Sequence, residues 1–367
     1  MSNSVSQAQE YYRNVDQKWA TDTTIHDVPL FEFKVLLKRD GIPPIDDPKF
    51  WYKDRADSAF FEHEPVISIA IDGMAKAYPL SILMFHEIVN DSLNNVPITV
   101  TYCPLCNAAI VFDRRLSFKG IDYLFDFGVS GMLRNSDMIM WDRQTESWWQ
   151  QFLGECLVGK LKGAQLTLLP SMLISYEEFT KSYPKGQILS TETGIDSDEE
   201  APYGTNPYEN YDDLANNQPR LFKGKVDDRL PAMERIININ VNGTDIIYPL
   251  SIINKKGVIN DNPHNYPVVI FFQSGVVSVM DKSEIKNSKD VGAVTVFSPG
   301  INGSTLTFIK TSEGFKDVQT QSLWSLTGKC IEGQHKGKQL TPIVHGNHFA
   351  FAWFAFKPEC EIYGQDK

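Results

Sequence analysis

Long hydrophobic runs are missing from this chain of 367 residues. Its longest apolar stretch, residues 349–356, is far shorter than the roughly 20 residues that a membrane-spanning helix needs, and it predicts a buried strand instead. We therefore expect no membrane span. The first residues also lack a basic start followed by an apolar segment, which is the pattern of an export signal. We expect a cytoplasmic location, unless a leader has been removed.

Clusters of basic residues are also missing, and the formal net charge is −11. Proteins that bind nucleic acid neutralise its phosphates with grouped lysines and arginines. The chain therefore predicts no nucleic-acid partner. It also shows no glycine-rich nucleotide loop, no nucleophile elbow and no His-Glu-x-x-His helix, so the sequence signals of those three kinds of site are absent.

Cysteine is scarce, with five residues, and an odd number in a large chain does not predict a disulfide framework. Cys156 and Cys330 occupy similar sequence surroundings, and Cys360 has no obvious partner. We interpret these three as small buried hydrophobic residues. Cys103 and Cys106 stand apart because they are only three positions from each other.

The length and a composition of 42% apolar and 12% aromatic residues are sufficient for about two packed domains. Short β-rich segments separated by turn residues recur along the chain, which predicts a mainly β (α+β) fold. We expect two homologous antiparallel domains, each a β-sandwich or barrel, with few short helices. The expected helices cover residues 7–19, 80–89 and 176–183.

A diverged internal repeat supports this division. Similar segments occur at residues 78–82 and 248–252, 86–91 and 257–261, 145–149 and 320–324, and 163–167 and 337–341. The spacing is that of whole domains, so we interpret the repeat as a tandem duplication. The predicted parts are an N-terminal arm (1–63), a first repeat domain (64–190), an acidic connection (191–233) and a second, degenerate repeat domain (234–367).

The acidic connection holds eight acids and no base over residues 191–213. Carboxylates of this kind can bind calcium, but the spacing matches no calcium-loop pattern. We interpret the segment as a surface connection.

The repeat provides an internal control for the candidate site. The second copy has Lys256 and residues 273–275 where the first has His86, Cys103 and Cys106. A scaffold that folds without these three side chains does not need them for its backbone. We therefore interpret them as site chemistry.

Metal binding is the favoured chemistry. The Cys-x-x-Cys spacing lets two sulfurs share one soft ion, and His86 could add an imidazole. Met140, with Met132 and Met138 on nearby positions, could add a thioether, and this donor set suits copper(I) or zinc. A zinc ribbon would need a second Cys-x-x-Cys, which is absent. Three ligands with an open position would suit a redox enzyme acting on a small molecule, electron transfer or metal transfer.

Two other interpretations stay open. The Cys103/Cys106 pair could serve thiol–disulfide exchange, or it could be a structural disulfide or buried turn in a noncatalytic binding or scaffold module. Thioredoxin-like chemistry would place the pair at the start of a helix, whereas residues 108–113 predict a strand.

A second polar group consists of Asn135, Asp137, Asp142 and Arg143. The sequence comparison finds no counterpart of the Asp142-Arg143 pair in the second repeat. These residues are either a structural turn and ion pair or a polar wall that orients a substrate or a metal ligand. His345 and His348 have a spacing that permits a shared metal, which we regard as the weaker interpretation.

Several of these motifs together resemble the bacterial DUF3179 family of uncharacterised proteins. The motifs cover residues 40–46, 77–80, 86–91, 102–106, 130–137 and 142–147. The resemblance spans residues 40–363 and implies no particular activity. Asn107 stands where the family usually has glycine, the acidic connection is longer here, and many relatives carry an export leader that this chain does not show.

Overall fold

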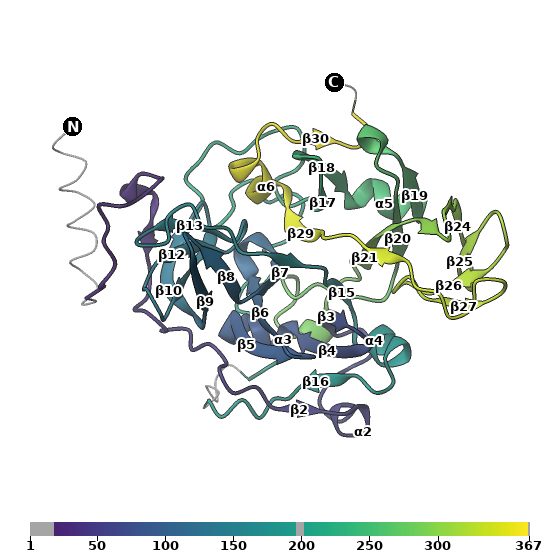
Figure 1. The fold of residues 1–367 in the computed structure, drawn as a ribbon, viewed down its shortest axis with the longest axis horizontal. Coiled ribbons are helices and arrows are strands. Elements are labelled where there is room, and N and C mark those ends of the chain that lie inside the picture. The colour runs from purple at the N-terminus through teal and green to yellow at the C-terminus, as the bar shows by residue number, and fades with distance from the viewer. Residues whose placement is uncertain (1–17, 196–201, 366–367) are drawn as a thin grey trace.

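The computed structural model describes residues 18–195 and 202–365, and most of its elements are short antiparallel strands (Figure 1). The predicted mainly β fold is confirmed. Within the described residues, no helix is both long and apolar enough to cross a membrane. The helices are α2 (Lys53–Ala56), α3 (Leu80–His86), α4 (Tyr176–Ser182), α5 (Leu250–Lys256) and α6 (Ala350–Phe356), with single 3-10 turns η1 (Leu30–Glu32), η2 (Pro104–Cys106), η3 (Pro263–Asn265) and η4 (Ile285–Asn287).

Three groups of strands form the first half of the chain. Their orders are β14-β7-β6-β5, β10-β11-β12-β13 and β15-β3-β4-β16, and all neighbours are antiparallel except β4 and β16. The strands are β3 (Pro65–Ile71), β4 (Met74–Pro79), β5 (Ile88–Leu93), β6 (Val96–Cys103), β7 (Ala108–Asp113), β8 (Arg115–Phe118), β9 (Ile121–Leu124), β10 (Phe127–Arg134), β11 (Asp137–Asp142), β12 (Trp148–Gln150), β13 (Glu155–Val158), β14 (Leu168–Leu169), β15 (Met172–Ser175) and β16 (Gln187–Leu189). The hairpin β8-β9 stands outside these groups.

The N-terminal arm belongs to the sheets rather than lying apart from them. Its strand β1 (Lys34–Val35) pairs with β10, and β2 (Phe50–Trp51) pairs with β16. Between these strands, Ile45 forms a bridge with Val89 of β5. The arm therefore joins three sheets, through β10, β16 and β5. Most of the helix predicted over residues 7–19 lies outside the described residues.

The second half has the same order of pairings. Its groups are β28-β21-β20-β19, β24-β25-β26-β27 and β29-β17-β18-β30, and β18 and β30 are again the parallel pair. The strands are β17 (Arg235–Val241), β18 (Thr244–Pro249), β19 (Val258–Asp261), β20 (Val268–Gln273), β21 (Ala293–Ser298), β22 (Gly300–Ile301), β23 (Ser304–Thr305), β24 (Phe308–Thr311), β25 (Gly314–Asp317), β26 (Leu323–Trp324), β27 (Cys330–Glu332), β28 (Thr341–Pro342), β29 (Gly346–Phe349) and β30 (Glu361–Ile362).

Hydrogen bonds also match between the halves. Tyr78 donates its hydroxyl to Asp91 (2.6 Å), and Tyr248 donates to Asp261 (2.8 Å). The Asn90 side chain clamps the backbone of Phe127 through its amide nitrogen and oxygen. Asn260 clamps Phe308 in the same way. These contacts fix which positions correspond, whereas the duplication as the origin of the correspondence stays a prediction.

The two halves are joined through a shared sheet and a shared core. Strand β21 pairs with β15 at Leu173 and Val294, so strands of both halves form one continuous sheet. Strand β29 also packs beside β7, as Figure 1 shows near the middle of the molecule. The largest hydrophobic cluster takes buried side chains from both halves. The proposed domain boundaries stay predictions.

The apolar run at residues 349–356 corrects one prediction. It forms helix α6 rather than a strand, and residues 350–354 are all buried. A helix that is buried on most sides shows no polar face, so its apolar run cannot be distinguished from a strand by periodicity. The predicted helices near 80–89 and 176–183 are confirmed in shorter form as α3 and α4.

Candidate metal centre

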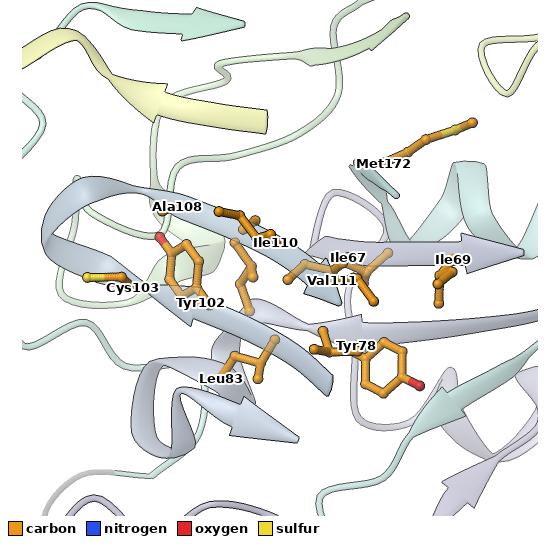
Figure 2. Packing of buried hydrophobic residues seen from close by; sticks show 14 of the residues in the cluster. Ile67, Ile69, Tyr78, Leu83, Tyr102, Cys103, Ala108, Ile110, Val111 and Met172 are labelled. Carbon is orange, nitrogen blue, oxygen red and sulfur yellow. The ribbon is translucent and has the colours of Figure 1, made fainter. Parts of the chain in front are cut away.

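The cysteine pair lies at the turn of the β6–β7 hairpin. Strand β6 ends at Cys103, η2 forms one turn that begins with Pro104, and Asn107 precedes β7. Asn107 has φ 52, in the left-handed region that asparagine tolerates better than most residues. Figure 2 shows Cys103 at this end of the hairpin, beside Tyr102 and Ala108. The strand predicted over residues 108–113 is confirmed, so the pair does not begin an α-helix.

Asp137 joins the two thiols from a neighbouring sheet. It is the first residue of β11, directly after the turn in which Asn135 and Ser136 have positive φ. One ligand atom from each of Cys103, Cys106 and Asp137 lies within 4.8 Å of the others, and all three residues are buried. Among the described residues no other cluster unites three such donors from His, Cys, Asp or Glu.

Hydrogen bonds hold one side of the Asp137 carboxylate. Oδ2 accepts from Gln150 Nε2 (2.6 Å) and from the backbone N–H of Phe152 (2.9 Å). Oδ1 is buried and has no hydrogen-bond partner in the described part of the chain. A carboxylate that is oriented through one oxygen and open at the other is arranged as a metal ligand is.

Four acidic groups are buried together at this place. Burial raises the pKa of Cys103, and it raises the pKa of Cys106 well above its ordinary value. Burial also raises the pKa of Asp137 to about 7, against the hydrogen bonds that lower it. The pKa of Glu87 rises to about 8 through burial and through the nearby Asp137 charge. Without a cation these groups favour their protonated forms, and a bound cation would reverse that preference.

Glu87 was not among the residues singled out from the sequence. It caps the C-terminus of α3 with φ 56, and the matching position of α5 is Gly257 with φ 70. Its backbone donates to Leu83 O and accepts from the N–H of Tyr102, both at 2.8 Å. Its carboxyl forms no hydrogen bond or ion pair within the described residues, although the residue is only 9% exposed. The sequence feature that could have identified Glu87 is the glycine that stands at its position in the second repeat.

His86 is not part of the cluster of three. Both of its ring nitrogens have partners: Nδ1 contacts Pro43 O (2.7 Å) and Nε2 contacts the hydroxyl of Tyr203. Burial lowers its pKa. In the second half, the matching Lys256 donates to the hydroxyl of Tyr363 (2.9 Å). Both halves thus use this helix position to hold a tyrosine, and the ligand role of His86 stays an untested prediction.

The three methionines divide between two cores. Met138 and Met140 lie in the buried cluster that also contains Cys103 and Cys106. Met132 belongs to a separate cluster on the other side of the sheet. This agrees with the strand register. Met132 of β10 pairs with Ile139, which lies between Met138 and Met140 on β11, and successive residues of a strand face opposite sides. The thioether of Met140 as a ligand stays a prediction.

Asp142 has a counterpart in the second half, which corrects the sequence comparison. It accepts from the backbone N–H of Thr145 (2.6 Å), and from Trp149 Nε1 (2.8 Å). Asp317 accepts the same two bonds from Thr320 (2.6 Å) and Trp324 (3.0 Å). The presence of this contact in both halves indicates a structural role, and a further role of Asp142 at the site stays a prediction. The counterpart was missed because the residues that follow Asp142 and Asp317 differ.

Arg143, Asn135 and the histidine pair also have structural positions. Arg143 pairs with Asp46 of the arm at 2.6 Å, and Asn135 lies in the β10–β11 turn. His345 contacts Ile343 O through Nδ1, and His348 contacts Asn238 through Nε2. A substrate role for Arg143 and Asn135, and a metal at the two histidines, stay predictions.

We expect Asp142→Asn to reduce stability without removing the site. Asparagine retains one acceptor but loses the charge, so a loss of about 1–2 kcal/mol in the free energy of unfolding is expected. Urea denaturation measures this loss, and Asp317→Asn is the matched variant in the half without cysteines. A substrate-binding role would instead leave stability unchanged.

The connection between the halves covers the cysteine turn. Tyr211 donates its hydroxyl to Leu105 O (3.0 Å), and Ser136 donates its hydroxyl to Arg220 O (2.8 Å). The Arg220 guanidinium lies 5.5 Å from the centre of the Tyr208 ring. Burial, with the Glu87 and Cys103 charges, raises the pKa of Tyr208 to about 12. The segment predicted to be a surface connection therefore also forms one wall of the site, while its residues 196–201 lie outside the described ranges.

Comparison with known proteins gives a family but no activity. The family model described as "Protein of unknown function (DUF3179)" matches residues 39–360, nearly the whole chain. No curated protein and no solved structure gives a match.

Proposed function

Because the chain belongs to the DUF3179 family, whose function is unknown, we propose from the site itself that the protein binds a zinc or copper ion through Cys103, Cys106 and Asp137. The observation that carries this proposal is the buried group of three ligand atoms within 4.8 Å of one another. Oδ1 of Asp137 supports it, because it is buried without a geometric hydrogen bond from the described residues, and such an oxygen is costly unless something binds it.

The donor set favours zinc over copper(I). Two thiolates and a carboxylate are ordinary zinc ligands, whereas copper(I) prefers thiolate, thioether and imidazole. A copper site would need Met140 or His86, and His86 has partners at both ring nitrogens. Three protein donors leave one position of a tetrahedral ion for another protein group or for a small molecule. If that fourth position is open to a small molecule, the proposal extends to a redox reaction of that molecule at the metal.

Thiol–disulfide exchange is the competing function. The closeness of the Cys103 and Cys106 sulfurs favours it. Burial works against it, since the raised pKa of each thiol lowers the fraction of reactive thiolate. The turn also leads into β7, so no α-helix N-terminus stabilises a thiolate.

Metal analysis of protein purified without added ions tests the proposal. We expect about one zinc per chain, because the cluster offers one set of donors. Apo protein prepared with a chelator should regain the same stoichiometry when zinc is returned. Protein that stays metal-free in zinc and forms a reversible Cys103–Cys106 disulfide would instead support thiol exchange.

A further inference from the structure

Glu87 has a backbone conformation that is unfavourable for a glutamate, which suggests that its side chain has a function. A non-glycine residue at φ 56 pays for a left-handed backbone, and glycine is the usual residue after the last turn of a helix. The second half has that glycine, Gly257, at the matching position. The match is fixed by the next strand, because Tyr102 N–H donates to Glu87 O and Phe272 N–H donates to Gly257 O. Residues kept in a strained conformation cluster at functional sites.

The Glu87 side chain is buried, and the described residues give it no partner. Its carboxyl forms no hydrogen bond or ion pair with the described residues. Its backbone oxygen accepts from the N–H of Tyr102 (2.8 Å), which places Glu87 beside the end of β6 that carries Cys103. The Asp137 charge raises the pKa of Glu87, and the Glu87 charge raises that of Cys103. Glu87 is not within the 4.8 Å group of Cys103, Cys106 and Asp137. Glu87 thus borders the cluster of three.

In the second half, the side chain of Lys310 lies beside the glycine that matches Glu87. The Lys310 ammonium donates to the backbone carbonyl of Phe272. Its side chain passes so close to Gly257 that a Cβ there would lie 2.8 Å from Lys310 Cδ. The matching residue of the first half is Val129, because Phe127 and Phe308 hold equivalent hydrogen bonds two positions earlier. The second half therefore carries a glycine and an ammonium at the two positions where the first half carries Glu87 and Val129.

We infer that Glu87 is the fourth protein ligand of the metal, so that two thiolates and two carboxylates hold a divalent ion in a closed site. This inference rests on the proposed function. Two thiolates and two carboxylates carry four negative charges, which a divalent ion such as zinc balances better than copper(I) does. Glu87 joins the ion by turning its side chain toward the cluster. A site with four protein ligands stores, transfers or is stabilised by its metal, whereas a site with three leaves one position at which a substrate can bind.

Replacing Glu87 with glycine separates the ligand role from the backbone strain. Glu87→Gly gives the first half the residue that the second half already has, so the metal-free variant should melt at a higher temperature than the metal-free wild type. Its zinc affinity should fall about 10-fold or more, since one ligand is lost. Glu87→Gln keeps the side-chain size and should also weaken zinc binding. The affinities are measured with zinc against a chromophoric chelator, and cobalt(II) spectra report the number of ligands.

The outcomes distinguish this inference from the proposal on which it rests. If Glu87→Gly and Glu87→Gln bind zinc as tightly as the wild type while Cys103→Ser does not, Glu87 is not a ligand and the three-ligand site stands. If the wild type itself binds no zinc, both fail. A cobalt(II) spectrum that is unchanged by Glu87→Gln would likewise overturn the fourth ligand.

Discussion

Cys103→Ser is expected to lower the zinc affinity at least about 100-fold while the metal-free fold remains nearly as stable. Even the hydrogen-bond partners of metal ligands are worth 10–100-fold in affinity, and a direct ligand should be worth more. A serine hydroxyl is a poor substitute because it does not ionise near neutral pH as a thiol can. The same result is expected for Cys106→Ser.

The stability expectation follows from the second half of the chain. Its matching strands, β20 and β21, pair with Gln273 at the position of Cys103, although residues 274–292 connect them where residues 104–107 connect β6 and β7. The paired strand ends therefore do not need a thiol, and each serine variant should cost roughly 1–2 kcal/mol in the metal-free state, the range of ordinary substitutions. Denaturant unfolding in the presence of a chelator measures this cost.

A matched control is available at Cys156. This thiol is also buried but contacts Val158 O, and it lies outside the cluster of three. Cys156→Ser should therefore keep its zinc while losing some stability. Full zinc affinity of Cys103→Ser would count against the metal site. So would a failure of Cys103→Ser and Cys106→Ser to give soluble protein when Cys156→Ser folds. The second finding would point to a structural role for the pair.

The sequence was sufficient for the cysteine pair and insufficient for its third donor. Cys-x-x-Cys spacing forces two sulfurs together whatever the rest of the fold does, so Cys103 and Cys106 could be predicted as neighbours. Asp137 is the first residue of β11, in a different sheet. No sequence pattern states how two sheets pack, and Asp137 was therefore assigned to the polar surroundings rather than to the cluster.

The end of α3 shows how one residue changes the interpretation. The internal comparison drew attention to His86 because Lys256 replaces it. In the structure, both of these side chains reach a tyrosine hydroxyl, whereas the next residue, Glu87 in place of Gly257, borders the cluster. The change from glutamate to glycine alters the backbone energy as well as the side chain. Sequence comparison gives the His86/Lys256 and Glu87/Gly257 replacements equal weight, because the backbone angle φ cannot be read from the sequence.

The wild type is expected to lose free energy of unfolding as the pH rises from about 4.5 to 7, and Glu64→Gln should not show this loss. Glu64 is 2% exposed, and its carboxyl accepts a hydrogen bond from the backbone N–H of Ser81 (3.3 Å) at the start of α3. Burial raises the pKa of Glu64 from 4.5 to about 7, more than the Ser81 hydrogen bonds lower it. The folded protein therefore holds this proton more tightly than the unfolded chain does.

The direction of the effect follows from that difference. The stabilising contribution of protonated Glu64 is fully present below pH 4.5 and is lost as the pH rises through about 7. The difference between the two pKa values corresponds to roughly 3 kcal/mol. Glutamine does not titrate, so Glu64→Gln should gain about that much stability relative to the wild type between pH 4 and pH 8.

Urea unfolding of both proteins at several pH values, with a chelator present, measures this difference. Asp137 and Glu87 titrate over a similar range, but they are present in both proteins and cancel when the free energies are subtracted. Glu62→Gln, an exposed neighbour, controls for the loss of one negative charge. A difference between wild type and Glu64→Gln that stays constant from pH 4 to pH 8 would mean that the folded and unfolded states bind the Glu64 proton equally, so that folding does not raise its pKa. The Ser81 hydrogen bond at the start of α3 would then offset the cost of burying the charge.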